Sequence, residues 1–105
     1  MMNEIFRKHL TETLGIDDVE LQDELIAEYK RTFYDTLDKL KEVLPSGDCE
    51  QLRRLGHALK GCALNIGDLE TKELSLNIEN GGKANDVEIC RVNIDGLIKQ
   101  AANLE

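Results

Sequence analysis

The chain has 105 residues, about the length of one domain, with 41% hydrophobic and 32% charged residues. Its formal net charge of −8 disfavours binding to DNA, RNA or an acidic membrane surface. No apolar run approaches the roughly 20 residues of a membrane span, and the first ten residues lack the apolar stretch of a secretion signal. We therefore expect one cytoplasmic domain over residues 1–105 that contacts neither nucleic acid nor membrane.

The distribution of residue types favours helix over sheet, because helix formers dominate and β-branched residues never form runs. Apolar residues three or four apart, interrupted by glycine, proline and capping residues, predict helices over about 3–14, 18–44, 48–66, 68–80 and 85–103. Short connections make successive helices antiparallel neighbours. The expected fold is all-α, an antiparallel up-down-up-down four-helix bundle with a short extra N-terminal helix.

Local signals set the expected ends of these helices. The first helix should stop at Gly15, and Asp17 or Asp18 can cap the second. The second helix should end at a Pro-Ser-Gly turn. It carries the clearest apolar stripe, which consists of Leu25, Ile26, Tyr29, Phe33, Leu37, Leu40 and Leu44. The later helices have caps at Asp48, at Asp68, and at Asn85 or Asp86, and Gly81-Gly82 is expected to break the chain before the last one.

The third predicted helix has an apolar face and a separate face around His57. A helix advances about 100° per residue, which places the histidine opposite the expected core stripe. That stripe consists of Leu52, Leu55, Leu59, Cys62 and Ile66. The water-facing side then carries Arg53, His57, Lys60, Gly61 and Leu64.

This outer face suits a histidine that carries a phosphoryl group. A neutral imidazole is a nucleophile near pH 7 and, on this reasoning, needs no activating base. Lys60 lies one turn on and can offset phosphoryl charge. Gly61 costs helix stability and leaves space for a partner to approach, while Leu64 is an apolar residue on a wet face, useful for docking. Any one of these residues alone would be unremarkable on a helix surface, and it is their combination that suggests a site.

The segment His57-Ala58-Leu59-Lys60-Gly61, with Gly67 six residues after Gly61, resembles the signature of the histidine-containing phosphotransfer (HPt) domain family. Leu74, Ile78 and Glu79 fall where that family has a leucine-rich stretch ending in Leu-Glu. Departures are Ala58 and Cys62, where Ser or Thr is common, and Thr71, where Leu is usual. The resemblance covers about residues 18–103.

The resemblance implies a phosphorelay intermediate rather than an enzyme. His57 would be the phosphoacceptor, Lys60 would stabilise the phosphoryl charge, and Gly61 would keep the site open. Arg53, Arg54 and Leu64 would contact the partner, the two arginines forming with Lys60 a basic spot that suits an acidic receiver site. The partners implied are response-regulator receiver domains and a hybrid sensor histidine kinase. The domain itself, expected to be monomeric, needs no cofactor, since the divalent metal would belong to the receiver.

Other functions are weighed against this one. The chain could be a non-phosphorylated module that docks on receiver domains, or the phosphoacceptor domain of a chemotaxis-type histidine kinase; the start at Met1 favours a stand-alone protein. A carboxylate-bridged metal bundle would need Glu three residues before an inward histidine, and Phe6 and Arg54 stand there before His9 and His57. Cysteine catalysis would need a thiol beside His57, whereas Cys62 lies toward the opposite side of the helix. Cys49, Cys62 and Cys90 are expected to be reduced thiols.

Overall fold

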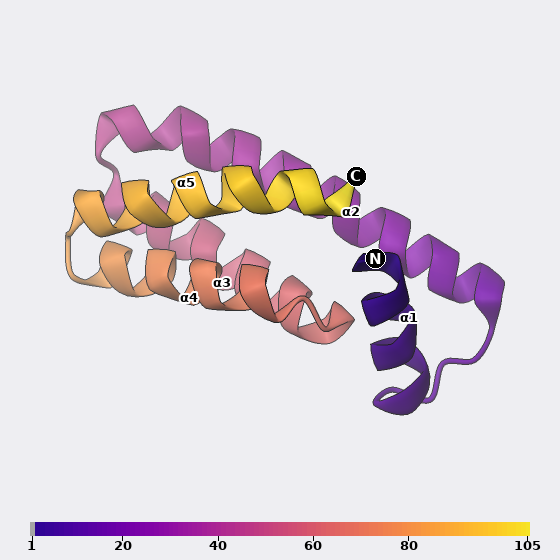
Figure 1. Cartoon of the computed structure of the whole chain (residues 1–105). Helices are drawn as coiled ribbons and strands as arrows, with labels where there is room; N and C mark the ends of the chain where they lie inside the picture. Colours follow the sequence, from indigo (N-terminus) through magenta and orange to yellow (C-terminus); the bar gives the residue numbers. More distant parts are fainter. Residues whose placement is uncertain (1) are drawn as a thin grey trace.

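A computed structural model describes residues 2–105 of the chain. Its helices are α1 (Met2–Glu12), α2 (Val19–Val43), α3 (Cys49–Ile66), α4 (Leu69–Lys83) and α5 (Val87–Leu104), with a 3₁₀ turn at Leu44–Ser46. The described residues contain no strand, so the all-α prediction is confirmed. In Figure 1 the four long helices lie alongside one another, with the α2–α3 and α4–α5 connections at one end and the α3–α4 connection at the other.

An aspartate caps the start of each long helix. The carboxylates of Asp18, Asp48, Asp68 and Asp86 each accept a hydrogen bond from a backbone N–H in the first turn that follows. Such caps satisfy donors that the helix itself leaves free, and the negative charge suits the positive end of the helix dipole. Of the alternatives left by the sequence, the structure selects Asp18 for α2 and Asp86 for α5.

The predicted break at Gly81-Gly82 is wrong, because α4 continues through both glycines to Lys83. Each glycine is buried at a contact with another helix. A Cβ on Gly82 would lie 2.7 Å from the Cys49 carbonyl oxygen, and one on Gly81 would lie 3.0 Å from Cys90 Sγ. The glycines therefore permit close packing rather than a turn, and the helix gains a last turn that ends at Lys83.

The core draws on every helix, and most of the predicted α2 stripe is buried. The short first helix ends at Glu12, two residues earlier than predicted, because the chain turns there toward Gly15. Its Phe6 and Leu10 are buried, whereas Ile5 and Leu14 are about half exposed. Phe6 packs edge-on against an α2 ring, Tyr29, with ring centroids 5.6 Å apart. In this way α1 covers one end of the bundle.

The buried face of α3 is turned toward α4 relative to the predicted stripe. Leu52, Leu59 and Ile66 are buried as expected, but Leu55 and Cys62 are only partly buried. In their place Gly56 and Ala63 are buried. Because the residues on this side of α3 are small, the backbones of α3 and α4 approach closely, and this side of α3 is buried.

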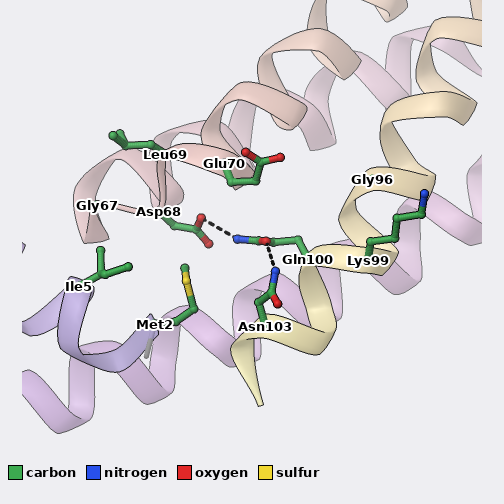
Figure 2. Close-up of a pocket in the computed structure, with 10 residues that line it drawn as sticks. All are labelled: Met2, Ile5, Gly67, Asp68, Leu69, Glu70, Gly96, Lys99, Gln100 and Asn103. Atoms are coloured by element: carbon green, nitrogen blue, oxygen red, sulfur yellow. Dashed lines mark hydrogen bonds between the residues drawn. The ribbon is translucent and has the colours of Figure 1, made fainter.

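A buried polar network ties α2, α4 and α5 together. Asp68 accepts hydrogen bonds from Tyr29 Oη (2.7 Å), Thr71 Oγ1 (2.7 Å) and Gln100 Nε2 (3.1 Å). Asn103 Nδ2 donates to Gln100 Oε1, and Figure 2 shows this pair and Asp68 beside a surface groove between α1, α4 and α5. Burial, and then the Asp68 carboxylate, raises the pKa of Tyr29, so its hydroxyl keeps its proton. Thr71, one of the three departures from the resembled pattern, thus has a structural partner.

Gly56 and Gly61, both on α3, provide a matched test of the close packing between α3 and α4. A Cβ on Gly56 would lie 2.8 Å from the Glu79 amide nitrogen and 2.9 Å from the Ser75 carbonyl oxygen, whereas one on Gly61 would meet nothing within 4 Å. Gly56→Ala should therefore lower the free energy of unfolding by about 1–3 kcal/mol. Gly61→Ala should raise it by up to about 1 kcal/mol, since alanine favours helix. Urea denaturation measures both, and equal midpoints would contradict the close α3–α4 packing.

Candidate functional site

His57 lies in the middle of α3 with 64% of its side chain exposed. Gly61 and Leu64 follow it on α3, and Leu64 is 51% exposed although it is apolar. The ring is thus part of the molecular surface rather than of the hydrophobic interior. A large partner can reach it without any opening of the bundle.

The imidazole has a partner that the sequence analysis did not give it. Nδ1 of His57 lies 2.8 Å from Oε2 of Glu79, a residue of α4 whose side chain is only 5% exposed. The sequence analysis assigned the histidine no supporting carboxylate, and the structure adds one. A buried carboxylate thus lies in contact with an exposed ring.

Two lysines bind the same carboxylate. Lys60 Nζ donates to Glu79 Oε1 at 2.7 Å, and Lys83 Nζ lies 3.8 Å from Oε2. The hydrogen bond from Lys60, followed by that from His57, holds the pKa of Glu79 below its usual value despite the opposing effect of burial. Glu79 is therefore a carboxylate at neutral pH and can only accept hydrogen bonds.

The state of the ring follows from that of its partner. Because a carboxylate has no proton to donate, the proton in the His57–Glu79 bond belongs to Nδ1. In the neutral ring the free lone pair is then on Nε2, the nitrogen away from Glu79. Glu79 thus selects the tautomer and the orientation of the imidazole, and leaves the lone pair of Nε2 free.

The packing of α3 on α4 explains how a buried carboxylate reaches a surface ring. Gly56 precedes His57, and the Glu79 amide lies where a Cβ of residue 56 would be. Gly82 makes a similar contact one turn further on, against Arg53 and the Cys49 carbonyl. Without side chains at these two positions, the α4 backbone lies directly against α3. The Glu79 side chain is then long enough to pass beneath His57 and meet Lys60.

Gly61 leaves open space beside the ring. Unlike Gly56 and Gly82, it has no neighbouring atom within 4 Å of the place that a Cβ would occupy. Packing within the chain therefore gives no reason for a glycine here, and the residue costs helix stability. The absence of a side chain at Gly61 leaves the surface next to His57 unobstructed.

The predicted basic spot is weaker than the sequence analysis suggested. Arg53 and Arg54 both pair with Glu50 of the same helix, at 2.6 Å and 3.1 Å, and these hydrogen bonds hold the pKa of Glu50 at about 2. Lys60 is likewise paired with Glu79. The positive charge near His57 is therefore partly balanced within the domain, and the added cation is Lys83, which the sequence analysis overlooked.

Glu79 entered the predictions only as part of a resembled stretch and had no predicted role. A usable signal was present, because Thr71, Ser75, Ile78 and Glu79 share one face of a predicted helix. An acidic residue on an inward face needs a cation or a hydrogen-bond donor beside it. Lys83 could not be placed, because the assumed glycine break removed it from the helix.

Among residues 2–105, no group of three or more His, Cys, Asp or Glu side chains is arranged to hold a metal ion. The groove of Figure 2 is lined by Asp68, Gln100 and their neighbours, and His57 does not line it. None of the described helices is long and apolar enough to cross a membrane.

Comparison with known families identifies the family of the chain. The family model of the Hpt domain matches residues 24–105, and the chain therefore belongs to the Hpt domain family. Members of this family are helical bundles that carry phosphoryl groups on histidine in two-component phosphorelays and are phosphocarriers rather than enzymes. They interact with receiver domains and kinases. Searches of curated proteins and of solved structures gave no significant match.

Replacing Glu79 tests the buried carboxylate. Its folded-state pKa is depressed, so its stabilising effect is complete above the unfolded-state pKa of about 4.3 and is lost as the pH falls through the folded value. Glu79→Gln should lower the free energy of unfolding by about 1–3 kcal/mol at pH 7. The difference between wild type and variant should shrink below pH 4.3 in urea melts. A difference that stays constant down to pH 2 would show that the Glu79 charge contributes nothing.

Proposed function

We propose that this domain is a phosphorelay intermediate that accepts a phosphoryl group on His57 from a receiver-domain aspartate and passes it to a second response regulator. The observation that carries the proposal is the exposed imidazole whose Nδ1 is bound by the buried Glu79 carboxylate. The match to the Hpt domain family supports the class of reaction. The direction of transfer and the partners are part of the proposal.

The transfer step follows from the state of the ring. Nε2 attacks the phosphorus of the aspartyl phosphate, and an N–P bond forms as the P–O bond to the aspartate breaks. The aspartate leaves as a carboxylate, and the ring keeps the proton on Nδ1. The positive charge that the ring gains then lies against Glu79, which stabilises it. No other group of this domain has to exchange a proton.

Alignment and charge neutralisation complete the mechanism. Phosphoryl transfer depends on in-line placement and on cations near the transferred oxygens. Lys60 supplies positive charge beside His57, and the receiver would supply the divalent metal; no cofactor is assigned to this domain. Arg53, Arg54 and Leu64 are proposed to contact the receiver in a small, transient interface around the ring.

The arrangement of the four long helices fits this role. We propose that α2–α5 form an antiparallel up-down-up-down bundle, which the positions of the connections in Figure 1 support. Such a bundle would hold α3 and α4 rigidly while leaving their outer faces free for a partner. We further propose that the domain acts as a cytoplasmic monomer.

Phosphate exchange with receiver domains tests the function directly. Wild-type protein incubated with a ³²P-labelled phosphorylated receiver should take up an acid-labile label, because phosphohistidine hydrolyses in acid. His57→Gln should take up none. A wild type that accepts label from no receiver but does accept it from an ATP-bound histidine kinase would assign the chain to the chemotaxis type instead. Docking without any uptake would indicate a non-phosphorylated interaction module.

The open space at Gly61 gives a second test. Gly61→Gln should leave the helical circular dichroism and the unfolding midpoint nearly unchanged, because the new side chain points into solvent. It should slow transfer from a receiver at least tenfold by obstructing the approach to Nε2. Gly61→Ala is the matched control and should transfer at close to the wild-type rate. Rapid transfer by the glutamine variant would show that the space has no role in access.

A further inference from the structure

The two lysines that bind Glu79 are held very differently. Lys60 Nζ is 2.7 Å from one carboxylate oxygen, and its side chain is 27% exposed. Lys83 Nζ is 3.8 Å from the other oxygen, beyond hydrogen-bond distance, and its side chain is 57% exposed. The same cluster thus contains one fixed cation and one loosely held cation.

Moving the Lys60 ammonium away from Glu79 would be unfavourable in free energy. Glu79 is almost completely buried, and Lys60 provides the hydrogen bond that most favours its charged form. If Lys60 left, a buried carboxylate would lose its shortest charged contact, which is strongly unfavourable. Lys60 therefore stays on Glu79, where it keeps the carboxylate ionised and adds positive charge beside His57 without contacting the phosphoryl oxygens directly.

Lys83 has no such constraint. Its contact with Glu79 is that of a partly exposed ion pair, a kind that contributes little free energy, so its side chain can reorient easily. It contacts Oε2, the same oxygen that accepts the proton of His57 Nδ1, and it therefore lies next to the ring. It is also the last residue of α4, and more than half of its side chain is exposed to solvent.

We propose that Lys83 is the cation that moves onto the phosphoryl oxygens of phosphorylated His57, while Lys60 stays on Glu79. This assignment rests on the proposed function and adds a residue outside the His57–Gly61 segment. A phosphoryl group brings up to two negative charges to the surface beside Lys83. The ammonium gains a stronger partner there, and Glu79 keeps its bonds to Lys60 and to Nδ1–H. No covalent bond or proton of Lys83 changes.

The test uses a small phosphodonor, so that no receiver is needed. The full chain is phosphorylated with phosphoramidate, and the phosphorus NMR signal that is absent in His57→Gln is followed against pH. A nearby cation favours the doubly charged phosphoryl group, so Lys83→Gln should raise the pKa of that group by about half a pH unit. Lys60→Gln should raise it less. Lys83→Arg should behave like wild type, and Lys99→Gln, on α5, controls for the change in net charge.

Stability separates the two lysines independently. Lys60→Gln should lower the urea midpoint of the unphosphorylated protein clearly, and Lys83→Gln should hardly change it. An unchanged phosphoryl pKa in Lys83→Gln, or a larger shift in Lys60→Gln, would overturn the role of Lys83 and leave the phosphoacceptor function standing. Failure of the wild type to be phosphorylated on His57 would instead count against the proposed function itself.

Discussion

The close contact between α3 and α4 at Gly56 is the constraint on which the site depends. The Glu79 backbone occupies the space that a side chain at residue 56 would need, and Gly82 repeats this contact one turn away. Only because the two helices lie this close does a buried glutamate reach a histidine on the surface. With an ordinary separation between helices, the His57 ring would be free to rotate and would lack a fixed tautomer.

The Glu79 carboxylate connects packing to chemistry. A buried charge is tolerated only where hydrogen bonds and opposite charges replace the lost water, and here His57, Lys60 and Lys83 do so. The contacts that compensate for the burial of the Glu79 charge also orient the imidazole and place two lysines beside it. The arrangement that stabilises the free domain thus also leaves the Nε2 lone pair free, as the proposed phosphoryl transfer requires.

A second polar cluster lies away from His57. Asp68, Tyr29 and Gln100 join three helices near the α3–α4 turn, where α1 packs its Phe6 against Tyr29. The side chains of this cluster are almost completely buried beside a surface groove and are hydrogen-bonded to one another, whereas the His57 ring is mostly exposed. The first helix, which lies outside the family match, therefore adds to the covered end of the bundle and leaves the His57 face uncovered.

The all-α fold, the capped helix starts and the outward placement of His57 were determined by the sequence itself, because helical periodicity and caps are local properties. The break predicted from local patterns at Gly81 and Gly82 is wrong, and Leu55 and Cys62, predicted as core residues, are only partly buried against the core. Whether a glycine ends a helix or admits a neighbouring helix depends on what lies opposite it. The partnership of Glu79 with His57 and the presence of Lys83 beside them were decided only by tertiary structure, since they join residues about twenty positions apart across a helix contact that no local pattern records.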